Sequence, residues 1–187
     1  MDSALLRKVQ TLAGDHSAKV LDPEPTSAVE PMYELIELFF FAYRDFVGDA
    51  DRLLAAYGFG RAHHRVLHFV SRQPGLTIAE LLDILKITKQ SLNRVLKELI
   101  EQGYVEARAG VVDRRQRLLF PTLEGKRIAL ECAQLQSERF GRVLAQLDGQ
   151  AQGEAKEFLL AMIDASEREK VASLIGGAGS KILPEAL

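Results

Sequence analysis

The fold is decided by residues 76–106, LTIAELLDILKITKQSLNRVLKELIEQGYVE, together with ARAGVVDRRQRLLF at 107–120 and PTLEG at 121–125. The first segment contains two apolar stripes with helical spacing, separated by a short turn. The stripes consist of Ile78, Leu81, Leu82 and Leu85, and then of Leu92, Val95, Leu96, Leu99 and Ile100. Thr77, with Glu80 three residues later, is typical of a capping box and predicts the start of the first helix. The pattern therefore predicts two amphipathic helices about a tight turn.

The second helix has signals at both ends. Thr88 can cap its first turn, after a turn formed by Lys86 and Ile87. Gly103 can adopt the left-handed conformation that follows many helices, which lets Tyr104 pack back toward the last turn. The second helix is therefore expected to end just before Gly103.

The polar face of this second helix carries side chains that suit DNA. Glutamine and asparagine match the N6 and N7 atoms of adenine, and arginine matches O6 and N7 of guanine. Lysine suits phosphates, and serine suits a phosphate or a base edge. The candidate DNA contacts are Thr88, Lys89, Gln90, Ser91, Asn93, Arg94 and Lys97. The alternative is an ordinary solvated helix face, which the neighbouring turn and basic hairpin disfavour.

An arginine-rich loop lies between two short strand-like runs. Val105 and Ala107 face the run 118–120, and Pro121 is expected to stop the strand ladder. Arg114, Arg115 and Arg117 are candidate DNA contacts, because a narrow minor groove attracts arginine by its negative potential. Asp113 is expected to orient one guanidinium by a bidentate ion pair. The alternative is a solvated surface loop, in which such pairs contribute little.

Two helices followed by such a hairpin predict a winged helix-turn-helix. In this arrangement the second helix enters the DNA major groove and the hairpin, or wing, reaches the minor groove. The sequence therefore predicts DNA binding.

The chain resembles transcriptional regulators of the MarR family. The resemblance lies in LIEQGYVE (99–106), in the wing motif DRR (113–115) and in PTLEG (121–125), and it is strong over about 61–131. The stretch GRAHHRVLHFV from Gly60 is similar to a subgroup of these regulators. The resemblance implies a helical homodimer with one winged domain per subunit, in which Asp113 and Arg115 form the wing pair. Arg114 and Arg117 are then further wing contacts.

Lys86 departs from the pattern of this family, because many members have glycine in the turn. Either the lysine adopts a strained positive φ or the turn has a different shape. The sequence leaves both possibilities open.

Composition limits the class of protein. A chain of 187 residues, 47% of them hydrophobic, predicts one folded unit, and no apolar run reaches the length of a membrane span. The start, MDSALLRKVQTLAGD, is a poor signal peptide, and a single cysteine suits a reducing cytoplasm. Residues 86–117 contain eight Lys/Arg and four Asp/Glu, a charge of +4 that leaves −6 elsewhere. A basic reading face on an acidic body agrees with DNA binding and argues against a membrane-surface role.

The fold class is expected to be mainly α with a small β-hairpin wing, flanked by N- and C-terminal dimerisation helices. The expected segments are an N-terminal extension (1–27), a dimerisation arm (28–58), the winged domain (59–122), C-terminal dimerisation helices (123–176) and a tail (177–187). The arm helix should begin between Ser27 and Pro31, and two long helices should follow Thr122. Because the arm is apolar almost all round, we expect it to form a dimer interface rather than the centre of a monomer core. Such a dimer sets its recognition helices about 34–36 Å apart and predicts a pseudo-palindromic operator.

Three kinds of switch are considered. The resemblance implies a small aromatic or lipophilic effector, bound between the winged domain and the dimer helices. Candidate pocket residues are Tyr33, Phe39, Phe40, Tyr43, His64 and His68, and these aromatics can equally be core. His63, His64 and His68 are metal candidates, but capping, core or surface roles are favoured because no ligand completes a site. Cys132 is expected to pack in the interior rather than sense oxidants.

No cofactor or metal is expected, and an enzyme is disfavoured. The sequence has no nucleophile elbow, phosphate loop, HExxH motif or paired carboxylates. The stronger rival is a winged helix that binds another protein. Such an interface usually exposes aromatic residues, and the polar face of the second helix has none. DNA binding is therefore favoured.

Overall fold

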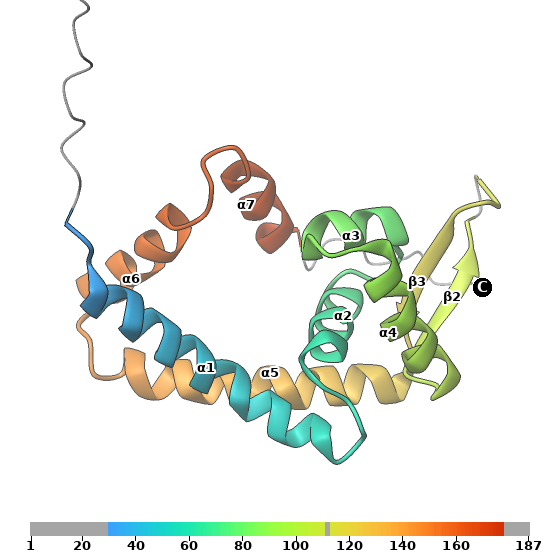
Figure 1. The fold of residues 1–187 in the computed structure, drawn as a ribbon, viewed down its shortest axis with the longest axis horizontal. Helices are drawn as coiled ribbons and strands as arrows, with labels where there is room; N and C mark the ends of the chain where they lie inside the picture. Colours follow the sequence, from blue (N-terminus) through green and yellow to red (C-terminus); the bar gives the residue numbers. More distant parts are fainter. Residues whose placement is uncertain (1–29, 111–112, 178–187) are drawn as a thin grey trace, which may run out of the picture. The chain divides into compact units, whose positions relative to one another are not determined.

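The computed structural model describes residues 30–110 and 113–177. It separates into two units, residues 1–36 and 37–187, with the boundary inside the first helix. The predicted N-terminal extension (1–27) and residues 178–187 of the predicted tail lie outside the described residues. The described elements are α1 (Tyr33–Ala55), α2 (Arg61–Arg72), β1 (Leu76–Thr77), α3 (Ile78–Leu85), α4 (Lys89–Glu101), β2 (Val105–Ala109), β3 (Arg117–Pro121), α5 (Leu123–Leu144), α6 (Gly149–Ala161) and α7 (Arg168–Gly176), as Figure 1 shows. The predicted fold class, mainly α with a small sheet, is confirmed.

The helix-turn-helix is formed by α3 and α4. Thr77 is the N-cap of α3: its hydroxyl accepts from the Glu80 amide at 3.1 Å, and its own amide donates to the Glu80 carboxylate at 2.7 Å. The predicted capping box is therefore confirmed. Thr88 likewise caps α4, because its hydroxyl accepts from the Ser91 amide at 3.2 Å.

The turn between these two helices contains a residue in the left-handed conformation. Lys86 has φ 49° and ψ 43°, and it is the one non-glycine residue with positive φ in the described part of the chain. Its amide donates to the Leu82 carbonyl at 2.9 Å, which ends α3. Of the two possibilities left open by the sequence, the structure has the strained lysine.

Lys86→Gly should therefore melt at a higher temperature than Lys86→Ala, by roughly 2–4 °C. Both variants remove the ammonium group, but only glycine adopts a left-handed conformation without strain. Thermal denaturation of both proteins at one concentration measures the difference. Equal melting temperatures would contradict a strained turn.

The second helix ends as predicted. Gly103 has φ 79°, the Tyr104 amide donates to the Leu99 carbonyl at 2.8 Å, and the Gly103 amide donates to the Ile100 carbonyl at 3.1 Å. This pair of hydrogen bonds is a Schellman motif. It turns the chain directly from α4 into β2.

The sheet has one strand more than expected. β3 pairs antiparallel with β2, placing Ala107 opposite Leu119, and also with the two-residue β1, placing Leu76 opposite Leu119. The ladder ends at Pro121, as predicted: this residue is the last of β3 and lies opposite Val105. Proline is tolerated there because β1 reaches only Leu119, so Pro121 has a neighbouring strand on one side.

A close backbone approach fixes the start of α5. The Thr122 hydroxyl caps the helix by accepting from the Gly125 amide at 3.1 Å, and it donates to the Gly103 carbonyl at 2.7 Å. A Cβ atom at Gly125 would lie 2.0 Å from the Tyr104 carbonyl oxygen. The motif PTLEG therefore joins the wing to α5 through a contact that only glycine permits.

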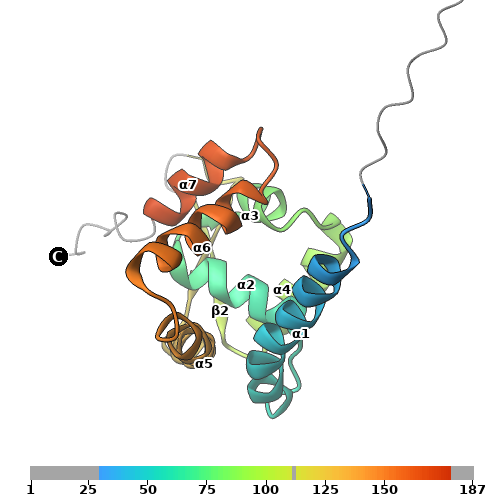
Figure 2. The ribbon, with the colours of Figure 1, turned by 90° about the vertical axis from the view of Figure 1, so that its left-hand side faces the viewer.

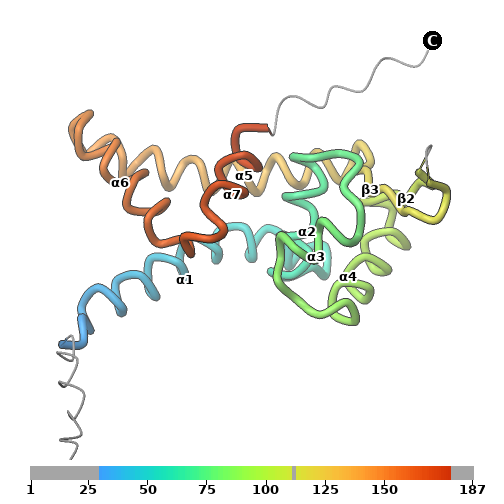
Figure 3. Tube along the Cα trace, turned by 90° about the horizontal axis from the view of Figure 1, so that it is seen from above, coloured from blue at the N-terminus to red at the C-terminus, as the bar shows by residue number. Residues whose placement is uncertain are grey.

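The core of the winged domain lies between these elements. α2, α3, α4 and the β2–β3 hairpin gather at the end of α5 that follows β3 (Figure 3). The largest fully buried apolar side chains of this core are Leu54, Val66, Leu67, Val70, Leu81, Leu92, Leu99, Val105, Leu119 and Ile128. This packing fixes which face of α4 points outward.

Two helix boundaries differ from those predicted. α1 begins at Tyr33, after Pro31, and not between Ser27 and Pro31; the proline keeps the preceding residue out of the helical region. The second of the two long helices expected after Thr122 is divided into α6 and α7. The Arg168 guanidinium donates to the carbonyls of Ala161 at 2.8 Å and Ile163 at 2.9 Å, which satisfies the end of α6. None of the described helices combines the length and apolar character needed to cross a membrane.

Candidate nucleic-acid interface

The outward face of α4 presents polar side chains to solvent. Lys89, Gln90 and Asn93 are exposed and have no side-chain partner within the described residues. Arg94 and Lys97 are also exposed and make only loose contacts one turn further on, at 4.0 Å to Glu98 and 3.7 Å to Glu101. Surface pairs of this kind contribute little, so both cations remain available for a phosphate or a base.

The two hydroxyls at the start of α4 are used locally. The Thr88 hydroxyl accepts from the Ser91 amide and donates to the Ser91 hydroxyl at 2.9 Å. Both residues are exposed. Their mutual hydrogen bonds therefore fix the N-terminal end of α4, the helix that carries the other predicted DNA contacts.

The wing turn is organised by Asp113, but not through the expected ion pair. Its carboxylate accepts from the backbone amide of Arg115 at 2.9 Å, and no ion pair in the described part of the chain joins Asp113 to an arginine. The short side chain of an aspartate reaches the backbone amide two residues later with little loss of side-chain freedom. A long arginine side chain would lose more freedom by bending back to pair with that carboxylate. The turn is closed by the Gln116 amide, which donates to the Asp113 carbonyl at 3.0 Å.

This arrangement leaves the wing arginines free. Arg114, Arg115 and Arg117 are exposed, and none has a side-chain partner among the described residues. Arg108 differs, because it pairs with Glu106 at 2.6 Å and lies over the Phe120 ring at 4.5 Å. The three free guanidinium groups and the polar face of α4 belong to one winged domain.

Gly110 is a wing residue that the sequence reasoning missed. A Cβ atom there would lie 2.6 Å from the Asp113 carbonyl oxygen, and the Gly110 amide donates to the Gln116 carbonyl at 3.0 Å. The glycine is visible in the sequence, but its role depends on strand register. It permits the tight approach that brings the arginines to the tip.

His63 has the capping role that was favoured over metal binding. Its Nδ1 accepts from the Gly60 amide at 3.2 Å, so Nε2 carries the proton and donates to the Glu98 carboxylate at 2.7 Å. The contact joins the start of α2 to α4. Within the described residues there is no cluster of three or more histidine, cysteine or acidic side chains that could hold a metal ion.

His64 on α2 and Cys132 on α5 are buried, and His68 on α2 is half-buried. Burial lowers the pKa of His64 and of His68, and Arg72 lowers that of His68 further. Burial raises the pKa of the Cys132 thiol to about 11, so the reactive thiolate is scarce at neutral pH. This burial supports the packing role expected for Cys132.

Of the candidate effector residues, His64 and His68 lie together, with ring centroids 6.3 Å apart. Tyr33, in the first unit, is exposed, and so are Phe39, Phe40 and Tyr43 on the part of α1 in the second unit. His68 lines two cavities, of about 280 and 340 Å³, whereas His64 and these aromatics line neither.

A broad apolar surface remains uncovered. The α1 side chains Leu38, Phe39, Phe40, Phe41 and Tyr43 are exposed, as are Phe140 and Val143 on α5 and Phe158, Leu159 and Leu160 on α6. Phe40 is 60% exposed. The alternative that this part of α1 is the centre of a monomer core is therefore wrong.

A cluster of charges joins α7 to the helix-turn-helix and was not predicted. Lys170 on α7 pairs with Asp83 on α3, and Lys86 in the turn lies 2.7 Å from Asp83 and 3.5 Å from Glu167. Hydrogen bonds from Lys170 and Lys86 lower the pKa of the Asp83 carboxyl to about 2. Figure 2 shows α7 next to α3. Because these residues are more than 80 positions apart, no local pattern could have revealed the contact.

Helices α2 to α4 with the β2–β3 wing define a winged helix-turn-helix protein. Residues 57–116 match the family profile described as MarR family. The chain is 43% identical over 139 residues to the HTH-type transcriptional regulator PetP of Rhodobacter capsulatus, covering 74% of this chain and 84% of that protein. The chain belongs to the MarR family, whose members are DNA-binding transcriptional regulators and not enzymes. The predicted membership of the MarR family and the prediction that the protein is not an enzyme are therefore both confirmed.

Solved structures show the same fold. A mutant MarR from E. coli complexed with operator DNA has a TM-score of 0.56 at 22% identity, covering 70% of this chain and 94% of that one. A MarR family protein of Mycobacterium tuberculosis, in complex with p-aminosalicylic acid, has a TM-score of 0.50 at 26% identity. The match covers 69% of this chain and 95% of that one.

Proposed function

We propose that this regulator acts in the cytoplasm as a homodimer on a pseudo-palindromic operator and responds to a small ligand. The observation that carries the proposal is the set of exposed side chains on α4 and the wing that have no partner, or only a loose one, among the described residues. α4 would read the major groove through Gln90, Asn93 and Arg94, while Lys89 and Lys97 bind phosphates. Arg115 would enter the minor groove, with Arg114 and Arg117 beside it.

The homodimer is supported by the uncovered apolar surface of α1, α5 and α6. A folded monomer rarely exposes so many neighbouring aromatic and aliphatic side chains without a partner. In this proposal residues 28–58 and 123–176 form the dimerisation part and residues 59–122 the DNA-binding domain. A second copy covers the apolar side chains and brings two DNA-binding domains to one operator.

Modulation by a small aromatic or lipophilic ligand is supported by two observations. The M. tuberculosis relative was solved with p-aminosalicylic acid, and His68 lines two cavities of this chain. The effector should lower DNA affinity; thermal stabilisation with unchanged DNA affinity would count against this part of the proposal.

The direct test is fluorescence anisotropy of the full chain titrated onto its own upstream DNA and onto a scrambled duplex, at two salt concentrations. Arg115→Ala should abolish tight binding to the upstream DNA, whereas Arg65→Ala, which removes an exposed arginine on α2 outside the interface, should not. Absence of binding by the wild type even at low salt would overturn DNA binding. It would favour a protein-interaction role for the winged helix.

Asn93→Ala should weaken binding to the specific site by about 1–3 kcal/mol and leave binding to the scrambled duplex almost unchanged. The reason is that an amide side chain reads a base edge and contributes little to a phosphate. Lys89→Ala is the matched contrast: it should weaken both duplexes about equally and lower the salt slope by roughly 1. A similar loss on both duplexes for Asn93→Ala would show that Asn93 reads no base.

A further inference from the structure

The hydrogen bond between His63 and Glu98 lies next to a side chain that is expected to read a base. Glu98 follows Arg94 by one turn of α4, so the two side chains share one face of the helix. His63 Nε2 donates to Glu98 Oε2 at 2.7 Å, whereas the other carboxylate oxygen, Oε1, lies 4.0 Å from Arg94 Nε. A separation of this length is too great for a hydrogen bond. The carboxylate is therefore bonded to α2 and not to the arginine on its own helix.

The imidazole ring of His63 is itself held in place. Its Nδ1 accepts from the Gly60 amide at 3.2 Å, and the ring stacks on Phe59 with centroids 4.7 Å apart and 20° between the planes. Phe59 is buried, and the side chain of His63 is only 13% exposed. The N–H group that donates to Glu98 thus has a fixed direction and little competition from water.

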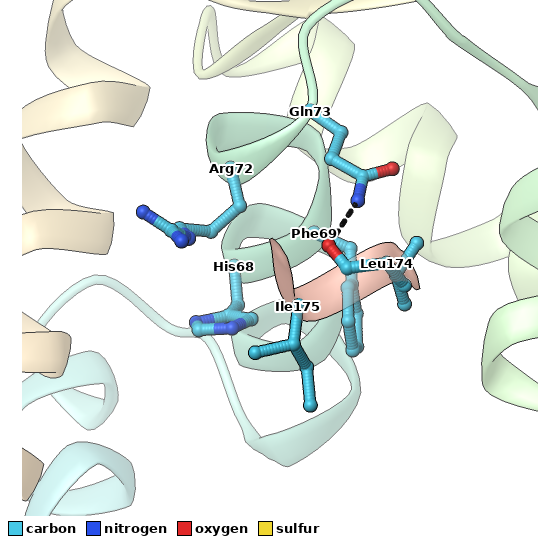
Figure 4. A pocket seen from close by; sticks show the side chains of 6 residues that line it. All are labelled: His68, Phe69, Arg72, Gln73, Leu174 and Ile175. Carbon is cyan, nitrogen blue, oxygen red and sulfur yellow. Dashed lines mark hydrogen bonds between the residues drawn. The ribbon is translucent and has the colours of Figure 1, made fainter. Parts of the chain in front are cut away.

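The other two histidines of α2 have different surroundings. His68 lies near Ile175 of α7 (Figure 4) and lines two cavities, which His63 does not. The Nε2 atom of His64 is buried without a hydrogen-bond partner among the described residues. Within the part of the chain that the structure describes, His63 is the one histidine of α2 whose two ring nitrogens both hold hydrogen bonds. Its ring therefore bridges the start of α2 to the recognition helix.

Without the imidazole, the Glu98 carboxylate would have a cation within reach. Opposite charges one helical turn apart attract each other, and a guanidinium group binds a carboxylate through two parallel hydrogen bonds. The Arg94 side chain is 81% exposed, so it is open to this approach. DNA would have to break the new ion pair before Arg94 could reach a base. An exposed ion pair of this kind corresponds to a loss of about two- to fivefold in affinity.

We propose that His63 is a positioning residue for DNA reading: it holds the Glu98 carboxylate against α2 and so keeps Arg94 free for a base. His63 acts through Glu98 and not on DNA itself. Sequence-specific binding then depends on the contact between α2 and α4 as well as on the outward side chains of α4. This inference rests on the proposed function, because it requires Arg94 to read a base.

The test is a double-mutant cycle, measured by fluorescence anisotropy of the full chain on the upstream duplex. His63→Phe keeps an aromatic ring against Phe59 but removes both hydrogen bonds, and it should weaken binding about two- to fivefold. In an Arg94→Ala protein the same change should leave affinity unaltered, because no guanidinium group remains for Glu98 to bind. A loss of the same size in that protein would show that His63 only supports the fold, and the proposal would be overturned.

Glu98→Gln tests the other end of the contact. In a Glu98→Gln protein, His63→Phe should again have no effect, since a neutral amide forms no ion pair with Arg94. Glu101→Gln is the matched control, because it removes the same charge from the same helix but from a residue that lies near Lys97. In this protein His63→Phe should still weaken binding by the same factor as in the wild type. If the two proteins respond alike, the position of Glu98 does not matter and the proposal fails.

His63→Gln is the conservative variant. A glutamine amide offers an acceptor and a donor, as the imidazole does, so this protein should bind the upstream duplex more tightly than His63→Phe. Circular dichroism checks that each variant is folded. If Arg94→Ala binds like the wild type, Arg94 reads no base, and the proposed DNA contact falls together with this role of His63. If Arg94→Ala loses affinity and His63→Phe does not, only the role of His63 is wrong.

Discussion

Gly125→Ala should destabilise the protein by about 3 kcal/mol, because the added methyl group has no space. Its carbon would lie 2.0 Å from the Tyr104 carbonyl oxygen. That oxygen cannot move away easily, since it accepts from the Thr122 amide at 3.1 Å and the Tyr104 amide is tied to Leu99 at 2.8 Å. Relief would require α5 to separate from the strand that leads into the wing. Urea denaturation at one protein concentration measures the loss.

Gly141→Ala is the matched control for this prediction. It makes the same change in the same helix, but a Cβ atom at Gly141 has nothing within 4 Å. Alanine is favoured over glycine inside a helix, so this variant should gain roughly 0.5–1 kcal/mol. If both variants shift the urea midpoint alike, the close approach at Gly125 is not what constrains the start of α5.

The features that the sequence predicted correctly are mostly local. Thr77, Thr88 and Gly103 act within four residues of the groups they bond, so residue type and spacing were enough to place the ends of α3 and α4. Such caps depend only on unpaired backbone groups at a helix end, which every helix has.

The features that the sequence did not predict depend on contacts between distant residues. β1 is two residues long and exists only because Leu76 lies opposite Leu119. The ion pair of Lys170 with Asp83 requires α7 to lie on α3, and the cavity of about 280 Å³ that His68 lines requires α7 to lie on α2. Neither strand pairing nor helix docking leaves a periodic signal in the chain.

The predicted DNA contacts illustrate both situations. The outward face of α4 follows from helical periodicity, because the buried stripe of Leu92, Leu96 and Leu99 fixes which residues are exposed. The role of Asp113 could not be fixed in this way, since a carboxylate beside three arginines has several possible partners. The structure gives it the Arg115 amide, so Asp113 shapes the turn and the guanidinium groups remain free.

Phe40→Glu should convert the proposed dimer to monomers and lower affinity for the operator by about a hundredfold or more. Phe40 is 60% exposed, its ring packs edge-on against Phe41 at 5.3 Å, and its neighbours on α1 are apolar. If a second copy covers this surface, a carboxylate there loses its water without gaining a partner. The operator loss follows because a monomer holds one half-site and gives up the gain from binding two sites at once. Sedimentation equilibrium and anisotropy measure the two effects.

Ala55→Glu is the control, since it adds the same charge at an exposed position of the same helix, outside the aromatic run. It should remain dimeric and bind the operator like wild type. A Phe40→Glu protein that is still dimeric would exclude this part of α1 from the interface. A Phe40→Glu monomer with full operator affinity would instead show that one winged domain suffices for specific binding, and the pseudo-palindromic operator would have to be abandoned.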